Sequence, residues 1–219
     1  MKVDERYFND FDNQTNDIDS VLIDDERILW RGKPNRKSYI SAAIFKMMPI
    51  ALIWLIFDGF FIGIIVNLMI HGDMELGLLG FIIPFFLIHL APVWIWIRNI
   101  IRSSVELKNL EYAITDRRII VKSGIIGIDF KSLTFPEIEN VNVKVGLIDK
   151  MCKVGDIYIN ASKNSVVLYD LENPYSLGKK LQKIVIDVKA DINYPNALRP
   201  QNNVGYHTFY TDDPFNRDK

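Results

Sequence analysis

Two ionisable side chains stand inside long apolar segments of this sequence. Asp58 is the only ionisable residue in segment 47–70, and His89 is the only one in segment 76–97. A lone carboxylate in hydrocarbon costs at least about 2.5 kcal/mol on insertion scales, so it needs a partner. A facing imidazole would offset much of that cost through a hydrogen bond.

The spacing of the two segments allows this pairing. If they form an antiparallel hairpin that turns near residues 70–76, Asp58 and His89 lie at the same depth. Gly59 and Gly63, at GxxxG spacing beside Asp58, would let the helices approach closely. Two interpretations stay open. The pair is structural, with Asp58 bonded inside the hairpin or protonated and facing a neighbouring subunit, or it is a proton or ion site that needs several assembled copies.

Other residues give no pattern of catalytic or metal chemistry. His71, His89 and His207 fall in a connector, an apolar segment and the C-terminal tail, so we do not expect them to share a metal. Cys152 has no histidine partner in its domain, and we interpret it as a small core residue. The sequence contains no P-loop, Rossmann or nucleophile-elbow motif. It therefore predicts no enzyme, no catalytic or metal site and no cofactor.

Charge argues against nucleic-acid binding. The 219-residue chain has a formal net charge of -1 and 49% hydrophobic residues. Its pI is near 6.3, and no basic stripe with interleaved aromatic residues is present. We expect the lipid bilayer, rather than nucleic acid, to be a partner, because the apolar residues are concentrated in segments 47–70 and 76–97.

The elements that must position the pair are two membrane spans. Segments 47–70 and 76–97 are each long enough to cross about 30 Å of hydrocarbon as a helix, so they predict a two-span hairpin over 47–97. The connector carries the acids Asp73 and Glu75. Basic residues lie outside the spans, at Arg31, Lys33, Arg36, Lys37, Lys46, Arg98 and Arg102. Because lysine and arginine stay inside, we expect both termini in the cytoplasm, at the cell membrane.

Aromatic residues mark the same boundary. Trp30, Trp94 and Trp96 are expected at the headgroup level, where amphipathic rings are favoured. With their basic neighbours they are candidate membrane-surface contacts. We assign 26–46 as a juxtamembrane segment and the acidic stretch 1–25 as a mobile N-terminal arm.

The pattern changes to short alternating runs after the second span. Six β-prone runs are expected, at 111–115, 118–124, 127–135, 138–145, 155–161 and 165–171. Asp116 and Arg117 form the turn of the first hairpin. Strands this frequent predict a small antiparallel barrel or sandwich.

One helix is expected to follow the strands. Asn173 and Pro174 cap segment 173–192, which places Leu177, Leu181, Ile184 and Val188 at helical spacing. The domain is therefore 103–192, and we interpret 193–219 as a flexible tail.

Three local motifs resemble the bacterial pleckstrin-homology (PH) domain membrane proteins. Tyr112–Gly124 is similar to the first hairpin of that family, and Val154–Ile159 to its later glycine-led strand. Glu26–Pro34 resembles the short motif before its first span. The resemblance implies a transmembrane hairpin followed by a PH-like β-barrel capped by a C-terminal helix. It further implies a non-enzymatic protein of the cell membrane, sometimes linked to envelope stress or bacteriocin resistance.

Function is less specific than fold. Phosphoinositide-binding PH domains use a basic first loop, whereas this chain offers only Arg117 and Arg118 there, so we do not expect inositol-lipid binding. The sequence favours a membrane-anchored interaction module that binds a protein or peptide and self-associates through the hairpin as a homo-oligomer. The rival is a small oligomeric channel or transport accessory that uses Asp58 and His89.

Overall fold

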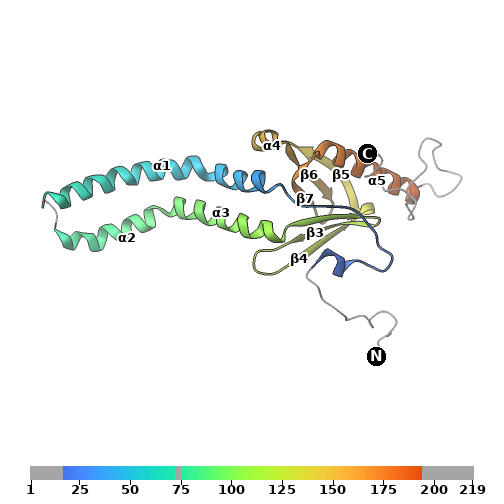
Figure 1. Cartoon of the computed structure of the whole chain (residues 1–219), viewed down its shortest axis with the longest axis horizontal. Coiled ribbons are helices and arrows are strands. Elements are labelled where there is room, and N and C mark those ends of the chain that lie inside the picture. Colours follow the sequence, from blue (N-terminus) through green and yellow to red (C-terminus); the bar gives the residue numbers. More distant parts are fainter. Residues whose placement is uncertain (1–16, 73–74, 194–219) are drawn as a thin grey trace, which may run out of the picture. The chain divides into compact units, whose positions relative to one another are not determined.

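The computed structural model describes residues 17–72 and 75–193, which divide into two compact units (Figure 1). A helical unit comprises Arg36–Lys108, and a β unit is built from the residues before and after it. The expected N-terminal arm up to residue 16 and the expected tail beyond Asn193 lie outside the described residues.

The helical unit contains one long helix and one bent pair of helices. Helix α1 spans Arg36–Ile70, with a mean hydropathy of 2.3 over its most apolar window. After a 3-10 turn, Leu76–Leu78, come α2, Leu79–His89, and α3, Ala91–Asn109, which are bent by 48° at Leu90. By length and composition the described residues therefore hold one helix that could cross a membrane, or two if the bent pair is a single span.

The bend corrects our expectation of a continuous second span over 76–97. Pro92 follows the break and has no backbone N–H, and its ring would clash with the carbonyl of Ile88 in an unbroken helix. The helix that contains the first predicted span is longer than the predicted segment 47–70. It begins at Arg36 rather than Met47.

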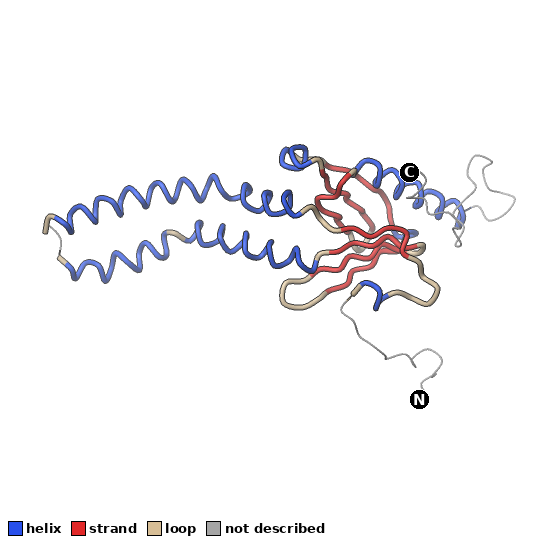
Figure 2. The backbone as a smooth tube through the Cα atoms, viewed as in Figure 1, coloured by secondary structure: helices blue, strands red, loops and turns tan. Residues whose placement is uncertain are grey.

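The β unit contains two antiparallel sheets. The first has the order β1 (Ile28–Gly32), β2 (Glu111–Thr115), β3 (Arg118–Ser123) and β4 (Asp129–Thr134). The second has the order β5 (Ile138–Lys144), β6 (Val154–Ala161) and β7 (Val166–Glu172). Helix α4, Leu147–Cys152, links β5 to β6, and α5, Pro174–Asn193, follows β7 (Figure 2).

The six predicted strands are confirmed to within two residues at each end, but the closed barrel is wrong. Strand β4 does not pair with β5, and among the described residues no strand joins an edge of the first sheet to an edge of the second. The link between β4 and β5 is a 3-10 turn, Phe135–Glu137, which contains Pro136. Proline cannot donate to a ladder hydrogen bond, so pairing is interrupted there.

Strand β1 was not predicted. It lies in the segment that we assigned as juxtamembrane, and it pairs with β2 so that Arg31 faces Ala113 and Gly32 faces Tyr112. The Trp30 ring lies over Gly32, where an added Cβ would come within 2.3 Å of the ring. A larger residue at position 32 would require the Trp30 ring to move, and the pairing with β2 makes this stretch part of the sheet.

The residues just before β1 are also packed. A 3-10 turn, Ile18–Val21, places Ile18 in a core cluster with Ala113 and Ile120, and Ile18 is fully buried. Residues 17–25 therefore differ from the mobile arm that we expected, because this apolar side chain is covered by β2 and β3.

The C-terminal helix is confirmed. Its stripe buries Leu177, Leu181 and Ile184, together with Val185, while the expected fourth position, Val188, is half-buried. The helix packs along β5 and the turn before it, and also contacts β6. Lys179 and Lys183 occupy its exposed face.

Candidate functional site

The helical unit brings Asp58 and His89 together. His89 Nδ1 lies 2.7 Å from Asp58 Oδ1, a hydrogen-bond distance. The Asp58 side chain is 2% exposed and that of His89 is 30% exposed. The second carboxylate oxygen, Asp58 Oδ2, is buried without a hydrogen-bond partner among the described residues.

Aromatic rings surround the imidazole. The ring of His89 stacks on Phe85 at a centroid distance of 5.3 Å, and the rings of Phe57 and Trp54 lie at 5.8 and 5.9 Å. Such contacts exclude water and make a polar interaction between Asp58 and His89 stronger than in solvent.

One further hydrogen bond joins α1 to the bent pair. The indole N–H of Trp96 donates to the Ile44 carbonyl at 2.8 Å. Between that contact and the Asp58–His89 pair, Ala51 of α1 and Val93 of α3 are buried. The polar pair thus lies in an aligned helix contact.

Gly59 and Gly63 do not take part in that contact. An added Cβ at either position would meet nothing within 4 Å. Instead the glycines line an open groove on α1, together with Phe60, Ile64, Asn67 and Leu68. Their expected packing role inside the hairpin is therefore not seen, and packing against a second copy stays a prediction.

We expect Asp58 and His89 to be energetically coupled. Asp58→Leu alone should destabilise the helical unit, because it leaves His89 unpaired, and the double change to leucine should recover part of the loss. The coupling energy should be about 1–2 kcal/mol, since polar pairs in membranes seldom contribute more. A double-mutant cycle on unfolding in bilayers would measure it, and strict additivity would show that the pair does not interact.

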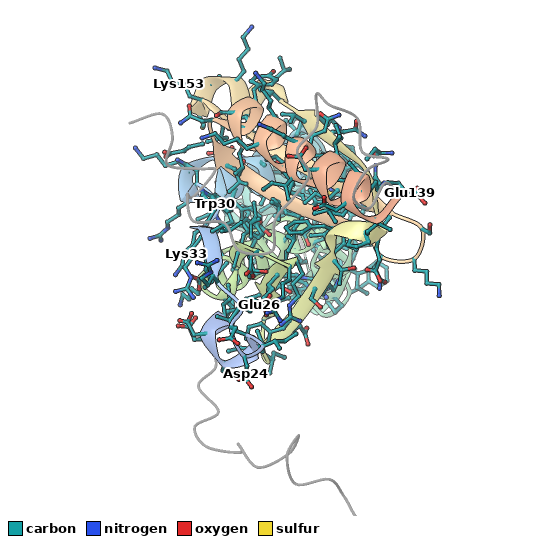
Figure 3. The ribbon with its side chains drawn as sticks, turned by 90° about the vertical axis from the view of Figure 1, so that its right-hand side faces the viewer. Asp24, Glu26, Trp30, Lys33, Glu139 and Lys153 are labelled. Atoms are coloured by element: carbon teal, nitrogen blue, oxygen red, sulfur yellow. The ribbon has the colours of Figure 1, made fainter. Side chains whose placement is uncertain are left out.

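The β unit contains a second buried polar cluster, centred on Glu26. Its carboxylate accepts hydrogen bonds from Arg118 Nε and NH2, both at 2.9 Å, and from the Thr115 hydroxyl at 2.7 Å. The Ile23 amide donates a further bond at 2.9 Å. Figure 3 labels Glu26 between Asp24 and Trp30, in the segment that leads into β1.

These bonds shift the pKa of Glu26. Burial alone would raise it, but the hydrogen bonds from Arg118, Ile23 and Thr115 outweigh burial and hold the pKa below its ordinary value of 4.5. Because Arg118 is committed to Glu26, only Arg117 of the basic pair remains exposed for an anionic ligand. Sequence reasoning missed this cluster, since its partners lie 92 positions apart.

Of the predicted surface contacts before α1, Trp30 and Arg31 lie in β1 and Lys33 follows it directly. Arg31 donates to Asp19 at 2.8 Å, which raises the pKa of Arg31, and it also lies 3.5 Å from Glu111. Lys33 Nζ lies 3.8 Å from the other oxygen of Glu111 and keeps a 63% exposed side chain. Of these residues and Trp30, Lys33 is the most available to a lipid headgroup.

The remaining predicted surface contacts lie in the helical unit. Arg36 and Lys37 open α1, Arg98 and Arg102 lie on α3, and all four are exposed. Trp94 donates its indole N–H to the Leu87 carbonyl at 3.1 Å, so this group and that of Trp96 already have acceptors. Headgroup contacts of these six residues stay a prediction.

A cleft opens at one end of the β unit. It is lined by Leu133, Glu137, Ala161, Ser162, Lys163 and Asn164. The hydroxyl of Ser162 donates to Glu139, which Figure 3 labels at the rim of the unit. The cleft adjoins β4, whose outer edge no described strand covers. An open edge of this kind can accept an extended peptide.

Metal chemistry finds no support in the part of the chain that the structure describes, where no group of three or more His, Cys, Asp or Glu side chains could hold an ion. Burial raises the pKa of Asp156, aided by nearby Asp149 and opposed by the Asp170 amide, Lys144 and the Tyr158 side chain.

Comparison with known families gives one match. A family model described as a bacterial PH domain matches residues 50–190, which covers most of α1, the bent helix pair and the β unit from β2 into α5. The match confirms the resemblance drawn from the hairpin and glycine-led strand motifs. No curated protein and no solved structure matches the chain.

Proposed function

The chain belongs to the bacterial PH domain family, and on that premise we propose that it is a membrane-anchored interaction module without catalytic activity. The helical unit anchors it in the cell membrane, and the β unit binds a protein or peptide on the cytoplasmic side. The observation that carries the proposal is the combination, in one chain, of a PH domain with the apolar helix α1.

The pairing of β1 with β2 supports two crossings. Strand β1 precedes the helical unit and β2 follows it, yet the two form one sheet. Both flanks would then lie on the same side of any membrane that the helical unit enters, which favours an even number of crossings. If α1 crosses the membrane once, the bent pair of α2 and α3 would form the second crossing, which returns the chain to the first side.

We expect the connector outside and the β unit inside. In a Cys152→Ser background, an impermeant thiol reagent added to intact cells should label a cysteine placed at Gly72 but not one at Ser165. The basic flanks and the acidic connector give this direction. After the cells are permeabilised, both positions should react, which serves as the control. The reverse pattern in intact cells would contradict the orientation.

The proposed binding site is the outer edge of β4 beside the cleft. A partner strand would add backbone hydrogen bonds there, and the cleft would receive one of its side chains. A photo-cross-linking residue at Ser132 or Asn164 of the full chain, in native membranes, should yield an adduct with a partner. The same residue at Lys183, on the exposed face of α5, is the matched control. Absence of adducts from both test positions, or an equal yield from the control, would contradict this site.

A second candidate function, an oligomeric channel or transport accessory, is favoured by one observation. Asp58 Oδ2 is buried beside His89 without a partner among the described residues, as a site that binds a proton or ion would require. Ion flux in liposomes that is abolished by Asp58→Asn would support this candidate, and unchanged flux would eliminate it.

A further inference from the structure

Several segments meet at the end of the β unit where the chain enters and leaves it. We call this the junction end, and it comprises residues 32–35 and 109–111, the loop 124–128 between β3 and β4, and α4 with Lys153. Gly32 faces Tyr112 across the sheet, and the Asn109 side chain donates to the Gly124 carbonyl at 3.0 Å. The β3–β4 loop therefore lies beside the point where the chain returns.

The second sheet reaches the same end. The Asn35 amide donates to the Asp170 carbonyl at 2.9 Å, and the Asp170 amide donates to Asp156 at 2.9 Å. Asp156 faces Lys144, the last residue of β5, so α4 starts and ends close by. Thus α4 and the loop 124–128 belong to one end of the unit.

This end carries the most exposed large apolar side chains of the described β unit. Ile126 is 103% exposed, Leu147 is 87% and Met151 is 85%. Leu147 and Met151 are four residues apart on α4 and so share a face. Exposed apolar side chains of this size at one end of a folded unit can mark an interaction surface.

The loop holds Ile126 in a defined position. Gly124 has φ +138°, and an added Cβ there would lie 2.0 Å from the Gly127 carbonyl oxygen, so the loop closes tightly around these two glycines. Ile126 stands at its tip with no covering side chain.

Charge at the junction end is mixed, with a slight basic excess. Lys33, Lys150 and Lys153 are exposed there, against Asp149 of α4 and Glu111, which pairs with Lys33. The two lysines of α4 and its C-cap flank Leu147 and Met151 directly. Apolar side chains interleaved with lysine are typical of surfaces that enter the headgroup region of anionic membranes.

We propose that the junction end docks on the anionic lipid surface, with Ile126, Leu147 and Met151 entering the boundary between headgroups and acyl chains. The proposal rests on the membrane anchoring given under the proposed function. Asn35 immediately precedes α1 and Asn109 ends α3, so the chain passes from this end directly into the anchored helical unit. Docking orients the unit, and it leaves the cleft beside Ala161, at the opposite end of β6 from Val154, turned toward the cytoplasm.

Lipid-quenching of single fluorescent labels tests the proposal. The full chain, with Cys152→Ser, receives one cysteine at Ile126, Leu147, Ile186 or Ile53, and each is labelled with an environment-sensitive dye. Nanodiscs contain phosphatidylcholine and phosphatidylglycerol, with or without a lipid that carries a nitroxide near the top of its acyl chain. We expect quenching at 126 and 147 comparable with that at 53 in α1, and none at 186, an exposed isoleucine of α5.

The controls separate the two proposals. Quenching at 53 with none at 126 and 147 would overturn docking and leave the anchor intact, whereas no quenching at 53 would refute the anchor itself. With Ile126→Asp and Leu147→Asp combined, a label at Met151 should lose its quenching. A label at 126 that is shielded only when a disc holds two copies, and is not quenched by nitroxide lipid, would instead assign the surface to a second copy and overturn docking.

Discussion

Replacement of Leu181 by alanine should lower the free energy of unfolding of the β unit by about 2–5 kcal/mol, the range for a fully buried leucine whose site cannot collapse. Leu181 is 0% exposed and lies on the face of α5 that packs along β5. Truncation would leave a cavity between helix and sheet. Pulse proteolysis of the full chain in nanodiscs, over a urea series, would measure the change.

Ile186→Ala is the matched control, because Ile186 lies on the same helix and is 53% exposed. Its effect should stay within about 0.5 kcal/mol. Equal losses for the two variants would contradict the stabilising role assigned to burial of Leu181, because alanine is a better helix former than leucine or isoleucine and neither loss could come from helix propensity. The full chain is needed, because residues 103–192 alone would lack β1 and the Ile18 cluster.

Replacement of Glu26 by alanine should destabilise the β unit by about 3 kcal/mol, near the lower end for breaking a buried ion pair. The Glu26 side chain is fully buried and that of Arg118 is 17% exposed, so Arg118 would lose its carboxylate and retain little access to water. The same proteolysis assay applies. The double change Glu26→Met with Arg118→Met should recover much of the loss, since two apolar side chains need no partner.

The same variant should change the pH dependence of stability. Glu26 has a lowered pKa in the folded chain, so its stabilising effect is present above the ordinary pKa of 4.5 and is lost as pH falls through the folded value. Wild type should therefore lose more stability than Glu26→Ala on acidification from pH 6 to below that value. Parallel pH curves for the two proteins would contradict the role assigned to Glu26.

Local patterns were sufficient for the elements whose contacts lie close together in sequence. Alternating Val141 and Val143 identified β5, and the spacing of Leu177, Leu181 and Ile184 identified α5. The depth argument also placed Asp58 opposite His89, where the structure has a hydrogen bond. In each case the period of apolar residues carries the information.

Contacts distant in sequence could not be found this way. Ile28–Gly32 is a short strand beside basic residues, and only its partner β2, beyond the helical unit, identifies it as part of a sheet. The pair of Glu26 with Arg118 depends on the same long connection. Hydropathy does not reveal the kink at Leu90, because it reports how apolar a segment is and not whether its helix is continuous. The signal for the kink is Pro92.

The connection between β1 and β2 has a consequence for the order of events during synthesis. A ribosome must complete α1, α2 and α3 before β2 exists, so β1 is synthesised well before its partner strand, in which Thr115 faces Ile28. Contacts of such separation are slow to form, and an unpaired strand is prone to wrong association meanwhile. Under the proposed anchoring, membrane insertion would therefore precede completion of the sheet, and a failed insertion would leave Ile28–Gly32 for chaperones or proteases to recognise.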